Sequence, residues 1–514
     1  MRLHLVLACL TALLLYLTLR HEPGSVLRFA QVEELAAQRS RTPYVPLAPS
    51  LPPQLRALTP QQEQGIFWKD DYRLWRKQGL PFQVDFYHVS KAFPTGPRLA
   101  AVDRKGIHPL AYSPLFFNFL NLKIDPPLPT TLPYAGFYLR YPINKPGALD
   151  GFFSVLGSNY WRVLAKDQVY GLTARALAID TAVDGAPEEF PEFTQWWLRQ
   201  PASDAAEMTL EALLEGPSVT GAYEFRVRPG AVTSVDVRAT LYFRKAVKRL
   251  GLAPFSSMYL YGENSGDHFG DAVHPEVHDS DGLLLDTADG EWIWRPLQAV
   301  PFLQLYDFEG TKLKGFGLLQ RDRDFQHYQD LDAKYNVRPS AWVTPHGDWG
   351  KGTVSLVQLP TNNTNTDNVV LFWRPEKPPG AGTTLSFSYT VDFYMNDAAR
   401  SPLAYAVATH CMAPIPGAPA APGPAPVPVR FLVDFVGNGI DGIDPAKPPD
   451  VDLRAEPEGT ALSGAKAEKN AYDGTWRVTF DMAPLKKNVP TELHCRLMRD
   501  GKPLSETWTY TWHQ

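Results

Sequence analysis

A proline-rich segment restricts the fold of this 514-residue chain more than any other feature. Residues 413–428 read APIPGAPAAPGPAPVP, with seven prolines in sixteen positions. Proline fixes φ and lacks a backbone N–H, so this run cannot form a helix or a central strand and prefers a stiff, extended conformation. We therefore predict two folded parts, residues 25–412 and residues 429–514, joined by a linker at 413–428.

Both predicted parts carry patterns that are typical of β-strands. PFQVDFYHV, AGFYLRYPI, TSVDVRATLYF and TLSFSYTVDFYM alternate apolar and polar residues before the linker, and VRFLVDF, DVDLRAE, GTWRVTF, ELHCRLM and ETWTYTW do so after it. Such alternation predicts half-buried strands. We expect a mainly β protein, with a large two-sheet sandwich followed by a small immunoglobulin-like sandwich. Helices are predicted at residues 29–36 and 60–78.

The N-terminus predicts export. Met1 and Arg2 precede a largely apolar run from Leu3 to Leu19, and this basic start followed by an apolar core is typical of an export signal. Because no Ala-x-Ala site follows, residues 1–24 are interpreted as either a cleaved signal or an uncleaved inner-membrane anchor. The protein is expected in the periplasm. There, Cys411 and Cys495 could pair, and two free thiols are the alternative.

Composition and motifs exclude several function classes. A net charge of -5 argues against nucleic-acid binding, which needs a basic face. Asp279-Ser-Asp281-Gly282 begins like a calcium loop, but Leu283–Leu285 follow where further acidic ligands are needed. A zinc site would need a third ligand that the sequence does not identify. No Gly-x-Ser-x-Gly elbow and no phosphate-binding glycine loop is present. We expect neither a metal nor a cofactor.

Tryptophans interleaved with charged residues favour a carbohydrate-binding cleft. Aromatic rings stack on the C–H faces of sugars, while carboxylates and arginines bind their hydroxyls. Each tryptophan taken singly has a core position as its alternative reading. The candidate substrate-binding residues are Glu276, His278, Trp292, Trp294, Arg295, Trp342, Trp349 and Trp373.

Five long strings carry a resemblance to a known family. They are YGLTARALAIDTA (170–182), HPEVHDSDGL (274–283), GEWIWRPL (290–297), GFGLLQRDRDFQHYQDLDAKY (315–335) and RPSAWVTPHGDWGKG (338–352). The chain resembles the periplasmic glucan biosynthesis proteins of the OpgG/OpgD (MdoG/MdoD) family from about residue 28 to its C-terminus. The resemblance implies a galactose-mutarotase-like N-terminal β-sandwich and a C-terminal immunoglobulin-like domain. The export segment lacks the twin arginine of the D proteins, which favours a G-like export route.

The resemblance also implies an activity on the β-1,2-glucan backbone of osmoregulated periplasmic glucans. Carried over by position, it makes Asp367 the general acid and Asp279 the general base of an anomer-inverting endo-β-1,2-glucanase, with Tyr335 in the same centre. Transglycosylation is an alternative outcome. A non-catalytic glucan-binding factor that assists synthesis or export is the alternative function. The candidate protein partners are the inner-membrane glucan glucosyltransferase and a second copy of the chain, and the sequence leaves the oligomeric state open.

Overall fold

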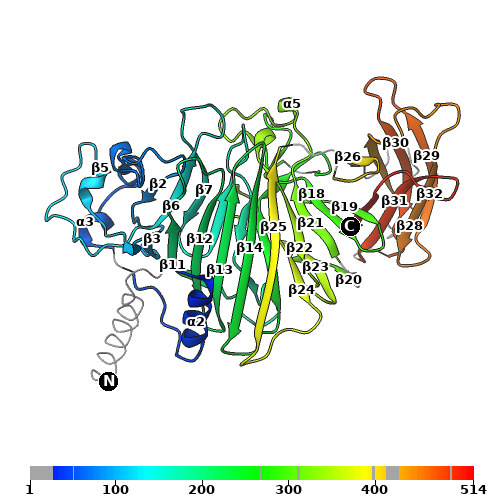
Figure 1. Cartoon of the computed structure of the whole chain (residues 1–514). Helices are drawn as coiled ribbons and strands as arrows, with labels where there is room; N and C mark the ends of the chain where they lie inside the picture. The colour runs from blue at the N-terminus through cyan, green and yellow to red at the C-terminus, as the bar shows by residue number, and fades with distance from the viewer. Residues whose placement is uncertain are drawn as a thin grey trace.

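The computed structural model describes residues 27–49, 51–266, 268–309, 313–395, 400–412, 428–486 and 489–513. The predicted export segment, and the predicted linker except for Pro428, lie outside these residues. Within them the fold is mainly β (Figure 1), which confirms the predicted class. Among the described helices, none combines the length and the apolar character needed to cross a membrane.

Two large sheets form the main body of the protein. The ten-stranded sheet has the order β2 (Gln83–Tyr87), β6 (Gly136–Tyr141), β7 (Asp150–Leu156), β8 (Tyr160–Val163), β9 (Thr173–Arg175), β15 (Leu250–Ser257), β24 (Val369–Pro375), β23 (Gly352–Gln358) and β20 (Gln304–Glu309), and β10 (Ala178–Ile179) pairs with β15.

The fifteen-stranded sheet runs through most of the chain. Its order is β28 (Asp450–Glu456), β31 (Thr491–Arg499), β33 (Thr507–Trp512), β19 (Trp292–Pro296), β18 (Gly282–Thr287), β21 (Leu313–Leu319), β22 (Ser340–His346), β25 (Thr384–Tyr394), β14 (Val232–Phe243), β13 (Val219–Arg228), β12 (Met208–Glu215), β11 (Glu192–Arg199), β3 (Arg98–Asp103) and β4 (Gly106–Pro109), and β32 (Lys502–Pro503) pairs with β31.

One hydrophobic core joins these two sheets into a sandwich. Trp161 of the ten-stranded sheet packs edge-on against Phe225 and Phe393 of the fifteen-stranded sheet, with ring centroids 5.8 and 5.9 Å apart. Because side chains alternate along a strand, the neighbours of each core residue lie on the opposite face. We call that opposite face the outer face of each sheet. The candidate site and the tryptophan cluster described below lie on two different outer faces.

The C-terminal residues form a second, smaller sandwich (Figure 1, orange and red). One of its layers is the four-stranded sheet β26 (Tyr405–Met412), β27 (Val429–Val436), β30 (Trp476–Ala483) and β29 (Ala461–Lys469), and the other is formed by β28, β31 and β33. Strand β26 precedes the predicted linker in sequence but pairs with β27 after it. Strand β33 pairs in parallel with β19, which links the two sandwiches through backbone hydrogen bonds. Cys411 and Cys495 are both free thiols.

Helices are short in the described residues. They are α2 (Phe29–Ser40), α3 (Pro53–Arg56), α4 (Pro60–Gln64) and α5 (Phe325–Tyr328), with 3-10 turns η1 (Asp70–Tyr72), η2 (Pro114–Phe116) and η3 (Tyr335–Val337). Helix α2 confirms the first predicted helix, and its buried face packs against β12 and β13. The predicted helix at 60–78 is wrong beyond Gln64: Gly65 ends α4, Leu74 bridges to Val84, and Trp75 has a φ of 67°.

Two small sheets complete the fold. Strand β1 (Phe67–Trp68) pairs with β5 (Phe117–Asn118), and β16 (Tyr259–Tyr261) pairs with β17 (Val277–His278). The second of these pairs positions the acidic segment that follows residue 278.

Candidate functional site

Asp367 lies just before β24, beside the outer face of the ten-stranded sheet. The hydroxyl of Thr173 on β9 donates a hydrogen bond of 3.3 Å to Oδ2 of Asp367. The same hydroxyl accepts one of 3.2 Å from Nε of Arg162 on β8. Asp367 is half-buried. Its carboxylate is therefore held against the outer sides of β8 and β9, far from its own position in the sequence.

The loop that carries Asp367 is fixed by its neighbour Asn368. The side-chain amide of Asn368 donates to the carbonyls of Tyr259 and Leu359, at 3.0 and 2.9 Å, and its oxygen accepts from the Tyr259 N–H at 2.9 Å. Turns earlier in the loop are capped by Thr361 and Asn363. Backbone capping is thus done by other side chains, and Asp367 points to a distant strand.

Asp279 directly follows β17 and is 5% exposed. Its backbone N–H donates to the carbonyl of Met258 at 2.8 Å, and its carboxylate accepts a charge-assisted hydrogen bond from Nη1 of Arg338. The Arg338 guanidinium also donates to the carbonyl of Ala333 through Nε and Nη2, at 3.2 and 3.1 Å. Asp279 is consequently fixed by backbone and side chain together.

Arg338 contacts two of the three candidate catalytic residues, Asp279 and Tyr335. It pairs with Asp279, and its guanidinium lies 4.2 Å from the ring centroid of Tyr335. The negative charge of Asp367 acts to raise the pKa of Arg338. Burial lowers the pKa of Arg338 to about 10; the Arg162 charge lowers it too, and Asp367 opposes them. Arg338 therefore remains protonated at neutral pH. Burial, with the Asp330 charge, raises the pKa of Tyr335 to about 12.

Glu276 and His278, expected as substrate-binding residues, form a buried pair beside Asp279. Nε2 of His278 lies 2.8 Å from Oε2 of Glu276, and the imidazole stacks on Tyr259 with centroids 5.2 Å apart. The exposed fractions of Glu276 and His278 are 6% and 1%. Burial alone lowers the pKa of His278, but the Glu276 hydrogen bond and the Asp281 charge outweigh it and raise the pKa to about 9. This buried pair comes directly before Asp279 in the chain.

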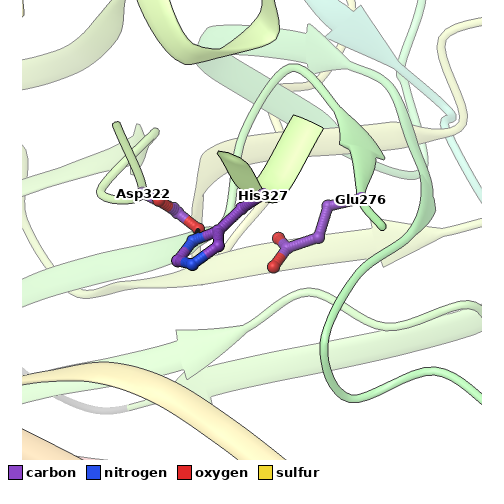
Figure 2. Close-up of side chains that lie close together, drawn as sticks. All are labelled: Glu276, Asp322 and His327. Carbon is purple, nitrogen blue, oxygen red and sulfur yellow. Dashed lines mark hydrogen bonds and ion pairs between the residues drawn. The ribbon is translucent and has the colours of Figure 1, made fainter. Parts of the chain in front are cut away.

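Figure 2 shows a neighbouring group in which the carboxylates of Glu276 and Asp322 lie on two sides of the His327 ring. Their ligating atoms lie within 4.8 Å of one another, as do those of Glu276, His278 and Asp281. Imidazole and carboxylate donors of this kind are able to bind a metal ion. Nδ1 of His327 lies 2.5 Å from Oδ2 of Asp322, and this hydrogen bond already accounts for their proximity. Of the residues in these two clusters, sequence analysis named Glu276 and His278 as candidate site residues.

Three of the expected sugar-stacking tryptophans lie elsewhere, on the outer face of the fifteen-stranded sheet. Trp292 and Trp294 on β19, and Trp342 on β22, join the core of the C-terminal sandwich. Trp294 and Trp342 are each 4% exposed, and Trp292 stacks on Trp342 with centroids 5.8 Å apart. Rings buried this way have no free face for a sugar. The expectation of platforms is therefore wrong for Trp294, which lies between Arg321 and the C-terminal strand β33, and for Trp342, which Trp292 and Arg400 contact.

The remaining expected contacts, Arg295, Trp349 and Trp373, are engaged with other parts of the fold. Arg295, 3% exposed, pairs with Glu492 and donates to Thr511 at 2.7 Å, so its role is in the junction of the two sandwiches. Trp373 is 2% exposed in the main core, and half-buried Trp349 packs against it with centroids 5.2 Å apart. These two rings line a separate cavity of about 220 Å³.

Sequence analysis missed the tyrosines and arginines on the outer face of the ten-stranded sheet. Arg140 lies 4.8 Å from the ring centroid of Tyr138 on β6, and Arg162 lies 5.8 Å from that of Tyr160 on β8. Both pairs come from a Tyr-x-Arg spacing, in FYLRY and NYWRV, whose intervening residue faces the core. That repeated spacing was the available indication. With Asp367 beside it, this face offers rings, guanidinium groups and carboxylates together.

Known proteins resemble the chain over nearly its whole length. The family described as periplasmic glucan biosynthesis protein, MdoG, matches residues 27–512. A glucans biosynthesis protein G of Ralstonia nicotianae is 39% identical, covering 94% of this chain and 94% of the relative. Proteins of the same name from Serratia proteamaculans (38% identical; 93% and 91% covered) and Pseudomonas aeruginosa (36%; 94% and 91%) are also similar. Consistent with its double β-sandwich, the chain belongs to the periplasmic glucan biosynthesis protein family.

Proposed function

We propose that this protein acts in the biosynthesis of osmoregulated periplasmic glucans, as an anomer-inverting endo-β-1,2-glucanase or a related transglycosylase. The observation that carries the proposal is the position of Arg338. Its guanidinium contacts Asp279 and Tyr335, and the charge of Asp367 acts to raise its pKa. Most enzymes that cleave glycosidic bonds use two carboxyl groups, one on each side of the bond that is broken. The names of the relatives indicate glucan as the polymer.

The surroundings of the two aspartates support a division of roles. A guanidinium partner favours the ionised form of a carboxylate, so Asp279 is suited to accept a proton from water. The resemblance makes Asp367 the partner that gives its proton to the leaving oxygen, and the hydrogen bond from Thr173 holds this side chain against β9. An inverting mechanism needs these two states at once, with water between them. Tyr335 lies against Arg338 and fixes its guanidinium.

The test is incubation of the purified protein with linear β-1,2-glucan, followed by sizing of the products and early NMR of their anomers. Hydrolysis predicts shorter chains with the α-anomer formed first. Transglycosylation predicts redistributed or cyclic chains without a matching rise in reducing ends. A β-anomer as the first product would overturn the roles of both aspartates, because it indicates a covalent sugar intermediate.

A non-catalytic glucan-binding factor is the second candidate, and one observation favours it. Asp279 is only 5% exposed and engaged by Arg338, and a carboxylate held in this way is a weaker base. This alternative predicts that β-1,2-glucan binds the protein and keeps its chain length during prolonged incubation. Calorimetry on the same samples separates it from an inactive preparation, which would not bind.

We further propose a periplasmic location, with residues 1–24 directing export either as a cleaved signal or as an anchor. A glucan-modifying protein at that place would receive its substrate from the inner-membrane glucan glucosyltransferase. Cell fractionation tests the location, and recovery of the mature chain in the cytoplasm would contradict it.

A further inference from the structure

An ion pair links the C-terminal sandwich to the segment that carries Asp279. Glu506 directly precedes β33 and is fully buried. Its carboxylate accepts hydrogen bonds of 2.6 and 2.9 Å from Arg321, which follows β21 and lies 185 residues away in the sequence. Arg321 also donates to the carbonyl of Ala406 on β26 at 2.9 Å, and the N–H of Ala406 donates to Glu506 at 2.9 Å. The Arg321 side chain is therefore held by two segments of the C-terminal sandwich.

The backbone beside Arg321 forms the other end of this link. The N–H groups of Arg321 and Asp322 both donate to Oδ2 of Asp281, the second at 2.7 Å. The N–H of Asp281 donates to the carbonyl of Leu319 at 2.7 Å. Asp281 lies two residues after the candidate base, and its other carboxylate oxygen lies 3.4 Å from Nδ1 of His278. The segment between β17 and β18 is thus bonded to the residues that follow β21.

Gln320, the neighbour of Arg321, makes a second connection to the candidate site. It is 1% exposed. Its Nε2 donates to the carbonyls of His278 and Tyr335, each at 3.2 Å, and its Oε1 lies 3.1 Å from Nδ1 of His278. Because His278 precedes Asp279, Gln320 holds the backbone beside the candidate base and the backbone of Tyr335 at once.

This arrangement favours a role in geometry more than in stability. A buried ion pair adds little net stability, because taking two charges out of water offsets their attraction. A guanidinium bonded to both oxygens of one carboxylate nevertheless has a defined orientation. Precision of that kind matters at a catalytic centre, where a misplacement of about 1 Å costs about 10²-fold in rate.

We propose that Glu506 is a positioning residue for Asp279 and Tyr335, and that it acts through Arg321 and residues 319–322. The two positioned residues belong to the large sandwich and Glu506 to the C-terminal one. The C-terminal sandwich therefore sets the geometry of a site to which it contributes no candidate catalytic residue. The catalytic part of this inference rests on the proposed function.

The experiment compares Glu506→Gln with Glu492→Gln in the full chain. Each variant removes the carboxylate partner of a buried arginine at the junction of the two sandwiches, since Glu492 pairs with Arg295. Hydrogen exchange is measured by mass spectrometry in a peptide that contains Asp279 and Asp281. We expect exchange there to become about tenfold faster in Glu506→Gln, because the unpaired arginine releases the segment bonded to it. The Glu492→Gln protein should keep the wild-type exchange rate in this peptide.

Kinetics supplies a measurement that a loss of stability alone would not change. With linear β-1,2-glucan, Glu506→Gln should lower kcat by about tenfold to 100-fold and leave KM within about twofold, because positioning is lost and glucan binding is not. Glu492→Gln should leave both constants unchanged. Arg321→Lys is the milder variant that carries the test if Glu506→Gln does not fold. It keeps the positive charge without the paired N–H groups, so both effects should be smaller and in the same direction.

The outcomes separate this inference from the proposed function. Unchanged exchange around Asp279 in the folded variant would overturn the positioning role, whether or not the protein cleaves glucan. Equally fast exchange in Glu492→Gln would also overturn it, because the whole junction would then have loosened. Faster exchange with an unchanged kcat would assign the ion pair to stability alone. If the wild-type protein cleaves nothing and exchange rises only in Glu506→Gln, the structural link stands and the catalytic proposal fails.

Discussion

The outer faces of the two large sheets both carry aromatic and charged residues, yet they have different surroundings. On β6 and β8, Tyr138 and Tyr160 with their arginines remain half-buried, and Arg162 is linked to Asp367 through Thr173. On β19 and β22, Trp294 and Trp342 are buried and belong to the same hydrophobic cluster as the C-terminal sandwich. Aromatic rings on the outer face of a sheet therefore indicate a surface that is contacted. The topology of the chain decides whether the contact is made by a ligand or by another part of the same chain.

The arginines of the two outer faces differ in the same way. On the covered face, Arg321 pairs with Glu506 through two hydrogen bonds of 2.6 and 2.9 Å and lies 3.6 Å from the Trp294 ring centroid. Glu506 is fully buried, so this arginine is committed to the junction. On the uncovered face, Arg162 contacts a neutral hydroxyl and a tyrosine ring. Its charge remains available to a ligand.

Asp367→Asn should have the largest effect and should act only on the uncovered face. We expect the rate of glucan cleavage or transfer to fall by about 10²–10⁴-fold, as for loss of a general acid. The melting temperature and glucan affinity should stay near their wild-type values. Asp348→Asn is the control, because Asp348 is an exposed turn residue that caps the N–H of Gly350. A folded Asp367→Asn protein with near wild-type activity would place the acid elsewhere.

Trp294→Ala should have the next largest effect and should act on stability. Truncating a buried tryptophan typically costs about 3–5 kcal/mol, and this ring also fills the space above Gly282. Denaturant unfolding should show the loss, while the remaining folded protein binds glucan normally. Trp292→Ala, at a half-buried position, should cost less. Weakened glucan binding by folded Trp294→Ala would contradict the assignment of this ring to the sandwich junction.

Tyr160→Ala should act on the outer face of the ten-stranded sheet. We expect glucan affinity to fall by about threefold to tenfold through loss of a stacking surface, with little change in melting temperature. Titration calorimetry with linear β-1,2-glucan measures the first and thermal denaturation the second. Tyr472→Ala is the matched control, because that ring is fully exposed on the C-terminal sandwich. Equal affinities in the two variants would exclude Tyr160 from the site.

The smallest expected effect concerns the pH dependence of the covered junction. Burial, with the charge of Glu276, raises the pKa of Glu263 to about 8, and Glu263 accepts a 3.0 Å hydrogen bond from the N–H of Thr409 on β26. A carboxyl group with a raised folded-state pKa stabilises the fold below its unfolded pKa and loses that contribution as pH rises to the folded value. Wild-type stability should therefore fall from about pH 5 to 8. Glu263→Gln should flatten this slope in melting temperatures, and an unchanged slope would assign it to another group.

The strands were predictable because alternation is a local property. Every quoted strand pattern, from PFQVDFYHV to ETWTYTW, lies on a strand of the structure. The predicted helix at 60–78 failed because contacts outside the segment decided it: Leu74 bridges to Val84 and Trp75 has a left-handed backbone. Apolar spacing alone does not contain that information.

The candidate site was predictable only in part. The resemblance proposed Asp279, Tyr335 and Asp367, and in the structure Arg338 contacts the first two while the charge of Asp367 raises its pKa. Arg338 itself, Thr173 and Arg162 come from other segments, and nothing in the local sequence relates them to Asp367. The prediction that Trp294 and Trp342 bind sugar failed for the same reason. The sequence shows that a tryptophan is present, but it does not show which residues pack over its ring.

The parallel pairing of β19 with β33 has a mechanical consequence. Ile293 and Trp294 lie in register with Thr507 and Trp508, so the two sandwiches share one sheet as well as a covalent connection. Force applied between them would load those backbone hydrogen bonds, and a rigid-body swing of one sandwich against the other would require breaking them. A chain cut after residue 412 would expose the edge of β19 and leave β26 unpaired, and uncovered strand edges of this kind recruit other chains. The isolated large sandwich should therefore aggregate more readily than the whole protein.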